Sequence, residues 1–331
     1  MTFAVSVVVP TYERPHLLQR CLQALLAQVL DPATYEIIVV DDAASAATQQ
    51  VVHSLAGEGG IWSEQPCLRY LPNPGPNHGP AAARNCGWRA ATGAIIAFTD
   101  DDCIPRPDWL VRGLAAFTPG VMGVSGRVIV PLPEAPTDYE RDAAGIQGIQ
   151  FLTANCFYRR QALTAVGGFD EQYALAWRED SDLFFALLQH YDGDELFVPA
   201  PGAVVLHPIR PAQWGVSVRQ QRRSLYNALL YKKYPALYRD IIQPSPPWVY
   251  YLTVAALLLM LVGLIANAAW LFVPAALTWL WFTARFCWLR LRNVSHAPAH
   301  VTEMIVTSAV IPPLSVFWRL AGAVKYRVLF L

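Results

Sequence analysis

The first hundred residues alternate between short, continuously apolar runs and longer segments with helical periodicity. Pro15 begins one such segment, whose apolar residues recur at spacings of three and four, and a Gly/Ala-rich helix is expected from about Pro80 to Ala91. Because strands this apolar are buried on both faces, the pattern predicts an α/β fold: a Rossmann-like, mostly parallel sheet flanked by helices. The apolar runs are FAVSVVV at 3–9, EIIVV at 36–40, LRYL at 68–71 and AIIAF at 94–98.

A long apolar stretch follows this alternating region. Between Asp240 and Arg285 the chain has 44 residues without a charge. Because about 20 apolar residues cross a bilayer core of roughly 30 Å, this length predicts two transmembrane helices, roughly 248–267 and 269–288, joined by a turn near Asn267. A buried apolar helix pair in a soluble core is the alternative interpretation.

The charges on either side of this hairpin predict its orientation. Cytoplasmic flanks of membrane spans are enriched in lysine and arginine, and both flanks carry them here. Both ends are therefore expected in the cytosol, which makes the chain a multi-pass protein of the cell (cytoplasmic) membrane with its N-terminal domain facing the cytoplasm. The flanking cations are Lys232, Lys233 and Arg239 before the hairpin and Arg285, Arg290 and Arg292 after it.

These patterns divide the chain into four expected parts. In the last part, Pro312 and Pro313 interrupt an apolar segment that ends with Arg319, Lys325 and Arg327. A third crossing would place these cations outside, so a re-entrant or interfacial segment is expected. The parts are the α/β domain at 1–210, an amphipathic interfacial linker at 211–245, the transmembrane hairpin at 246–289 and the re-entrant or interfacial segment at 300–331.

The charge balance bears on possible nucleic-acid partners, and the cysteine content bears on the cellular compartment. Lysine plus arginine and aspartate plus glutamate both number 25, so no basic field exists to hold nucleic acid. The six cysteines are scattered without a CxxC pair, which is typical of reduced thiols in the cytosol.

Acidic residues gather at the predicted strand ends. Glu13 follows the first strand, Asp41 and Asp42 follow the second, and a run of three aspartates at 100–102 follows the fourth. Ligands bind at the carboxyl ends of such strands, and adjacent carboxylates require compensating charge. Carboxylates concentrated at one edge suit Mg²⁺ or Mn²⁺, which binds one or two of them together with substrate phosphate oxygens. A lone aspartate after a strand is more often a helix cap or turn residue.

Several motifs together resemble the family 2 glycosyltransferases of GT-A fold. The resemblance covers roughly residues 3–235 and implies inverting transfer of a sugar from a nucleoside diphosphate, most often uridine diphosphate, to an acceptor hydroxyl or phosphate. The motifs are, in order, VSVVVPTYERP, IIVVDDAAS, GPAAARNCGWRAATG, AFTDDDCIP, GGFDE and WREDSDL.

The resemblance also implies where the donor nucleotide binds. Pro10, Thr11 and Glu13 are expected against the base and ribose. Asp42 would hydrogen-bond the base, and Arg84 would lie near the nucleotide. Glu13 replaces the family's usual asparagine, and Ala43-Ala44-Ser45 replaces the usual Gly-Ser, so details of base contact are expected to differ.

The aspartate run matches the family's DXD motif. Asp102 is the expected direct metal ligand, Asp100 would contact ribose or metal, and Asp101 would contribute to the substrate site. Enzymes of this fold often use a late histidine as a further ligand, which here is His207. A softer imidazole ligand favours Mn²⁺ over Mg²⁺, or a phosphate contact instead. A surface histidine in a loop before Pro208 is the alternative.

The acceptor side is expected in the WREDSDL motif. On the resemblance, Asp180 is the general base, with Trp177 and Glu179 facing the substrate. Inversion needs a carboxylate on the far face of the sugar to take the acceptor's proton. Acidic residues in a helix's first turn are also common for structural reasons.

Further features bear on the acceptor. In QQRRSL, Gln220 and Arg223 are candidate acceptor or diphosphate contacts, or else the polar face of an amphipathic helix. Residues 131–150 lack a clear period and are expected to form a loop beside the acceptor. A domain held at the membrane indicates membrane lipid as a partner and a lipid-linked or glycan acceptor.

Three other functions fit parts of the pattern. A polyprenyl-phosphate glycosyltransferase would need little deprotonation of its acceptor. A nucleotidyltransferase would use similar carboxylates, but VVVPTYERPH lacks the glycine-rich phosphate loop. A non-catalytic membrane-anchored module that binds nucleotide is the third.

Overall fold

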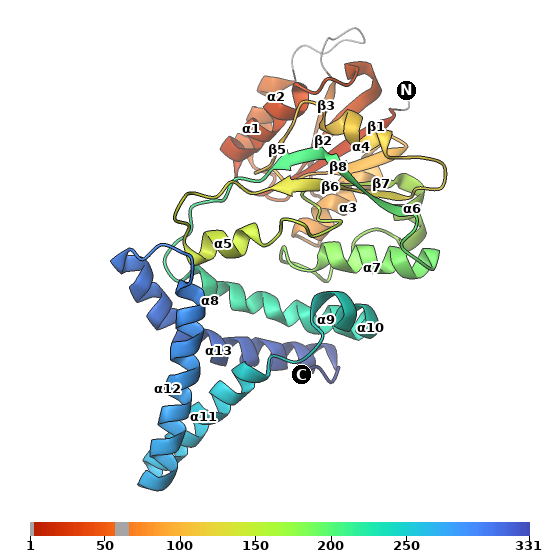
Figure 1. The fold of residues 1–331 in the computed structure, drawn as a ribbon. Coiled ribbons are helices and arrows are strands. Elements are labelled where there is room, and N and C mark those ends of the chain that lie inside the picture. The colour runs from red at the N-terminus through yellow and green to blue at the C-terminus, as the bar shows by residue number, and fades with distance from the viewer. Residues whose placement is uncertain (1–2, 57–65) are drawn as a thin grey trace. The chain divides into compact units, whose positions relative to one another are not determined.

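The computed structural model describes residues 3–56 and 66–331 (Figure 1). The chain divides into two compact units. The first, here the sheet unit, comprises residues up to 131 together with 144–209. The second, here the helical unit, comprises residues 132–143 and 210–331. The segment 132–143 therefore leaves the sheet unit, joins the helical unit, and returns.

The first half of the sheet unit alternates strands and helices, as the sequence predicts. Its four strands are parallel and lie in the order β3-β2-β1-β4. The predicted apolar runs all form strands, and the helix expected from Pro15 begins there. The elements are β1 (Val5–Thr11), α1 (Pro15–Leu26), the 3-10 turn η1 (Pro32–Thr34), β2 (Tyr35–Asp41), α2 (Ala46–Leu55), β3 (Cys67–Pro72), α3 (Pro80–Ala90) and β4 (Ile95–Phe98).

The second half extends this sheet with mixed pairing. Strands β4 and β7 are antiparallel, as are β6 with β7 and β5 with β8, whereas β6 and β8 are parallel. The eight strands run in the order β3-β2-β1-β4-β7-β6-β8-β5. The elements are β5 (Ile104–Pro105), α4 (Trp109–Ala115), β6 (Gly123–Ile129), β7 (Cys156–Arg159), α6 (Arg160–Val166), α7 (Glu179–Tyr191) and β8 (Phe197–Leu206).

Apolar cores on both faces of the sheet explain the continuous apolar runs. Along β1, Val7 and Val9 pack into one core with Leu22 of α1, and Val8 packs into the other with Trp88 of α3. Successive strand residues point to opposite faces, so a strand covered on both sides is apolar at most of its positions. Figure 1 shows helices on both faces of the sheet.

The helical unit contains the predicted hairpin. Its helices are α11 (Trp248–Ile265) and α12 (Ala269–Leu291), and Asn267 adopts a left-handed φ of 50° in the turn between them. In the described part of the chain, α11, α12 and α13 (Pro298–Tyr326) are long and apolar enough to cross a membrane. The unit also holds α5 (Asp138–Ala144, except its last residue), α8 (Val216–Gln220), η2 (Gln221–Ser224), α9 (Leu225–Lys233), α10 (Pro235–Leu237) and η3 (Tyr238–Ile242).

Two local expectations were wrong. Residues 131–150 are not wholly irregular, because α5 begins at Asp138 with two acidic residues in its first turn. Such residues stabilise a helix N-terminus. Pro312 and Pro313 do not interrupt the last segment, because α13 continues through both. Each proline removes one backbone donor, and the helix continues on both sides of the pair.

Candidate active site

Polar side chains meet at the carboxyl edge of the sheet. Thr11 ends β1 beside Asp41, which ends β2, and the aspartate run follows β4 by one residue. Because β2, β1 and β4 are adjacent and parallel, these ends share one edge. The sheet topology thus assembles in space the acidic cluster that the sequence predicts.

Each carboxylate of the aspartate run lies near an arginine. Arg84 Nη2 donates to Asp100 Oδ1 over 2.7 Å. Arg14 Nη2 lies 3.0 Å from Asp101 Oδ1, and Thr11 Oγ1 donates to the other oxygen of Asp101 over 2.7 Å. The carboxylate of Asp102 lies 3.6 Å from the imidazole of His207 and 3.8 Å from Arg14. These contacts provide the compensating charge that three adjacent carboxylates require.

Asp100 and Asp101 differ in how their surroundings shift their pKa values. Burial acts to raise the pKa of Asp100, but the charge and hydrogen bond of Arg84 outweigh it and hold the pKa below its ordinary value. Burial raises the pKa of Asp101 to about 7, with Arg14 opposing and the neighbouring aspartates adding to the rise. Asp100 is therefore an anion near neutral pH, whereas Asp101 exchanges its proton there.

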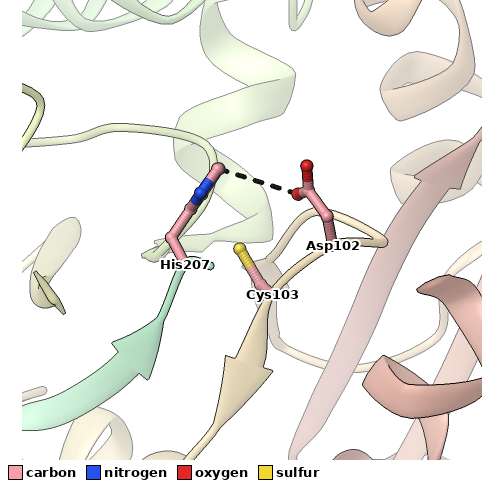
Figure 2. Close-up of side chains that lie close together, drawn as sticks. All are labelled: Asp102, Cys103 and His207. Atoms are coloured by element: carbon pink, nitrogen blue, oxygen red, sulfur yellow. Dashed lines mark ion pairs between the residues drawn. The ribbon is translucent and has the colours of Figure 1, made fainter. Parts of the chain in front are cut away.

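Asp102, Cys103 and His207 form a group that could hold a metal ion (Figure 2). Their ligand atoms lie within 4.8 Å of one another, and within residues 3–56 and 66–331 this is the one group of its kind. Pairing of β5 with β8 places Ile104 beside Leu206, so the residues next to them, Cys103 and His207, also meet. The pairing thus brings Cys103, just before β5, close to the end of β8, although about a hundred residues separate them in the sequence.

This group fits a divalent cation. A carboxylate oxygen and an imidazole nitrogen are ligands that Mn²⁺ accepts. Cys103 is fully buried, and burial raises the pKa of its thiol well above the ordinary value, so it remains protonated and is a poor ligand. Asp100 lies outside the group and turns to Arg84.

Arg84 connects the aspartate run to the start of α7. Besides its bond to Asp100, its Nη1 donates to Glu179 Oε1 over 3.0 Å. Arg84 and Glu179 are both buried. Burial raises the pKa of Glu179 to about 7, Arg84 opposes this shift and Asp180 adds to it. A buried cation thus joins residues that the sequence assigns to the donor and the acceptor sides.

The backbone before α7 has an unusual conformation. Arg178 has φ 76° and ψ −5°, in the left-handed region that non-glycine residues seldom occupy. This turn brings Glu179 and Asp180 into the first turn of α7, where Asp180 Oδ1 accepts from the amide of Ser181 over 2.6 Å. Strained backbone of this kind is concentrated at functional sites.

Asp42 contacts the segment between β3 and α3. Its Oδ1 accepts from Asn73 over 2.6 Å and lies 3.2 Å from His78 Nδ1, and its Oδ2 accepts from the Gly79 amide over 2.7 Å. A carboxylate with three such partners is well ordered. A hydrogen-bond donor group of the nucleotide's base would have to join these partners or replace one of them.

The other predicted residues occupy several different elements. Pro10 lies within β1, Glu13 is exposed with a left-handed φ of 51°, and Trp177 is half-buried under the guanidinium of Arg178. Gln220 ends α8 and Arg223 lies in η2, both in the helical unit. Sequence reasoning missed Arg14 and Cys103.

A signal for Arg14 existed. The need for a cation beside three carboxylates, and the place of Arg14 just after β1, pointed to it. No comparable signal identified Cys103, because its nearness to His207 depends on how β5 pairs with β8.

The fold defines an α/β protein with an acidic edge at the carboxyl ends of its parallel strands. The family model described as Glycosyl transferase family 2 matches residues 6–179, and that of Glycosyl transferase family group 2 matches residues 95–283. Each spans more than half of the chain, which therefore belongs to the family 2 glycosyltransferases.

Individual relatives agree with this assignment. Glycosyltransferase AglE of Haloferax volcanii is 31% identical over 180 residues, which cover 50% of this chain and 55% of that protein. The GalNAc(5)-diNAcBac-PP-undecaprenol beta-1,3-glucosyltransferase of Campylobacter jejuni is 34% identical over 98 residues, covering 30% of this chain and 29% of that protein. The chain thus spans about half or less of the length of these relatives.

A solved structure shares the fold. It is the mannosyltransferase PcManGT from Pyrobaculum calidifontis, described in complex with GDP-Man and Mn²⁺. The superposition has a TM-score of 0.54 at 21% identity and covers 99% of this chain and 88% of that one. This similarity supports the GT-A type of architecture.

Proposed function

We propose that the chain transfers a sugar, with inversion, from a nucleoside diphosphate sugar to an acceptor at a membrane. The observation that carries the proposal is the pair of linked sites at the sheet edge. Asp102 and His207 lie 3.6 Å apart at one end, and Arg84 joins Asp100 to Glu179, next to Asp180. One end suits a charged diphosphate and its cation, and the other suits a proton acceptor.

Asp180 is the proposed general base. Its carboxylate takes the proton of the acceptor hydroxyl while the hydroxyl oxygen bonds to the anomeric carbon of the sugar. The bond from that carbon to the diphosphate oxygen breaks, and its electron pair leaves with the nucleoside diphosphate. Glu179 is buried and its carboxylate accepts from Arg84, so it is proposed to orient the acceptor rather than to act as the base.

The proposed metal is Mg²⁺ or Mn²⁺, with the mixed oxygen and nitrogen ligands favouring Mn²⁺. Asp102 and His207 would hold it, and when bound it would stabilise the negative charge of the departing diphosphate. Thr11 and Arg14 hold Asp101 beside this site, so that Asp101 orders the loop. The Mn²⁺ in the description of PcManGT is consistent with this choice.

The proposed setting is the cytoplasmic membrane. Two crossings by α11 and α12 would leave both flanks, with their lysines and arginines, on the cytosolic side. The acceptor is then proposed to be lipid-linked, as the name of the Campylobacter relative indicates for that enzyme. Transfer to a polyprenyl phosphate is the second candidate, because its acceptor is already ionised and is held in the same membrane.

A donor and acceptor panel tests this function. Purified wild-type protein in detergent would be incubated with Mn²⁺, each nucleotide sugar, and either polyprenyl phosphate, a lipid-linked sugar or free sugars. We expect nucleoside diphosphate release with one donor and a lipid acceptor, and loss of release in Asp102→Ala. Transfer to the free sugars in preference to every lipid would overturn the acceptor proposal. No turnover with any pair would favour a non-catalytic nucleotide-binding module.

A further inference from the structure

Helix α13 has two different long faces. One face is buried within the helical unit and includes polar side chains, among them Thr307, Ser308 and Arg319. The other is exposed and apolar. Its residues recur at spacings of three, four and seven, so they form one stripe along the helix. They are Val306, Val310, Phe317, Leu320 and Val324.

Polar contacts fix the buried face along most of its length. Near the start of α13, Glu303 Oε1 accepts from the amide of Gly215 over 2.8 Å. Further along, Arg290 Nη1 of α12 donates to Thr307 Oγ1 over 2.7 Å. Toward the end, Arg319 Nη1 donates to Gln243 Oε1 over 3.0 Å. The helix is therefore attached at both ends to the segment 215–243, and α8, η2 and α9 of that segment pack against it.

The segment 215–243 is strongly charged. Were α13 to cross the bilayer with these contacts intact, the segment would have to enter the hydrocarbon, where charged side chains are costly. Were α13 to lie along the surface, the same charges would remain in water or at the headgroups. The charged residues are Arg219, Arg222, Arg223, Lys232, Lys233, Arg239 and Asp240.

The end of the chain secures this arrangement. Arg327 adopts a left-handed φ of 52° and turns residues 328–331 back along the unit. Phe330 is fully buried, its ring lies 3.7 Å from the guanidinium carbon of Arg319, and the main-chain oxygen of Leu331 accepts from Arg319 Nη2 over 2.8 Å. The C-terminal end of α13 is thus held against the same charged segment as its start.

We propose that α13 is an in-plane membrane helix whose exposed apolar stripe lies in the cytosolic leaflet. The inference rests on the membrane anchoring of the hairpin proposed above. In Figure 1, α13 crosses α12 and continues beyond it, instead of joining the hairpin as a third parallel helix. Exposed Lys325 and Arg327 near its end favour anionic lipid headgroups. The surface that this stripe recognises is therefore an anionic lipid leaflet.

Single cysteines test the topology in the full-length chain. They would replace Asn267, Thr302 or Lys325, all exposed, in a background with Cys67, Cys86 and Cys287 changed to serine. A membrane-impermeant maleimide would be applied to inside-out and right-side-out membrane vesicles. We expect Thr302→Cys and Lys325→Cys to react only in inside-out vesicles. Reaction of Lys325→Cys only in right-side-out vesicles, or in neither, would overturn the proposal.

The Asn267→Cys variant tests the two-span hairpin independently of the orientation of α13. We expect it to react only in right-side-out vesicles, since the turn would lie outside. If it reacted in inside-out vesicles, the two-span hairpin would be wrong, while the comparison of Thr302 with Lys325 would still decide whether α13 crosses.

A second measurement does not depend on labelling rates. Spin labels at Val306, Val310 and Val324 would be compared in depth with one at Leu259, within α11, by their accessibility to oxygen and to a nickel chelate in anionic vesicles. An in-plane helix predicts similar, shallow depths for the three α13 labels. A depth at Val310 that matches Leu259, with Val324 much shallower, would contradict it.

Discussion

The guanidinium of Arg84, on α3, donates to the carboxylate of Glu179, at the start of α7, over 3.0 Å, although 95 positions separate the two residues. The same guanidinium holds Asp100 at 2.7 Å. A buried cation between two carboxylates sets the spacing between the aspartate run and the helix that carries Asp180. One buried side chain therefore contacts both ends of the proposed site.

Replacing Arg84 should uncouple these ends. Arg84→Met would leave Glu179 and Asp100 without their shared cation, and breaking a buried ion pair by removing one partner costs about 3–5 kcal/mol. We expect a clear fall in the thermal unfolding temperature in detergent. Arg89→Met is the matched control. Arg89 lies on the same helix, but its side chain is exposed and its ion pair with Glu171 is long, at 3.5 Å. Equal unfolding temperatures for the two variants would contradict the coupling.

Asp101 should contribute a pH-dependent term to stability. Its pKa is raised by burial from 3.8 to about 7, so the folded state binds this proton more tightly than the unfolded chain does. The stability from this group is fully present below about pH 3.8 and is lost as the pH rises through about 7. We expect Asp101→Asn to reduce the fall in unfolding temperature between pH 4 and 7 relative to wild type.

The control for this pH dependence is Asp108→Asn. Asp108 is exposed, pairs with Arg112, and has a lowered pKa. Its contribution to stability is small and increases with rising pH, so Asp108→Asn should not reduce the fall in unfolding temperature. Identical pH profiles for wild type and Asp101→Asn would show that Asp101 titrates at its ordinary pKa.

Close packing of α3 on the sheet should be intolerant of added volume. A methyl group on Gly87 would overlap the side chain of Val8 and lie 2.9 Å from Val40 Cγ2. Overpacking of this kind costs about 1–3 kcal/mol and would move the helix that carries Arg84. We expect Gly87→Ala to lower the unfolding temperature and weaken donor binding. Gly202→Ala, whose methyl group would come no closer than 3.4 Å to Arg112, should change neither property.

The parts of this protein that the sequence predicts are those in which local pattern determines structure. The buried strands β1, β2 and β4 follow from uninterrupted apolar runs, and α11 and α12 from an uncharged stretch long enough for two helices. The acidic edge follows from the parallel order of those strands.

What the sequence did not predict depends on contacts between distant segments. Arg14 lies between Asp101 and Asp102 because a turn after β1 approaches the end of β4, and Cys103 reaches His207 through the β5–β8 pairing. The partners of Asp42 come from the segment after β3. The left-handed conformation of Arg178 has no marker in the sequence, because arginine is not one of the residue types that favour it.

Asp180→Asn should distinguish a hydroxyl acceptor from a phosphate acceptor. General base catalysis contributes roughly 10²–10⁴-fold, so this variant should lose about that factor in kcat with little change in the KM of the donor. An ionised lipid phosphate needs no base, and its transfer would survive the substitution. Asp192→Asn, at an exposed aspartate that follows the end of the same helix, is the control. A full loss of donor binding in Asp180→Asn would contradict a role confined to the proton transfer.

The central claim is that Asp102 and His207 hold the cation that binds a nucleotide sugar. The most direct test is the unfolding temperature of wild type, Asp102→Ala and the control Asp108→Ala in detergent, with a panel of nucleotide sugars in the presence or absence of Mn²⁺. Ligands that bind the folded state raise this temperature by an amount that grows with the ratio of the ligand concentration to the dissociation constant. The account predicts that one nucleoside diphosphate sugar stabilises wild type and Asp108→Ala only with Mn²⁺, and never Asp102→Ala. Equal stabilisation of all three proteins, or stabilisation that ignores the metal, would contradict it.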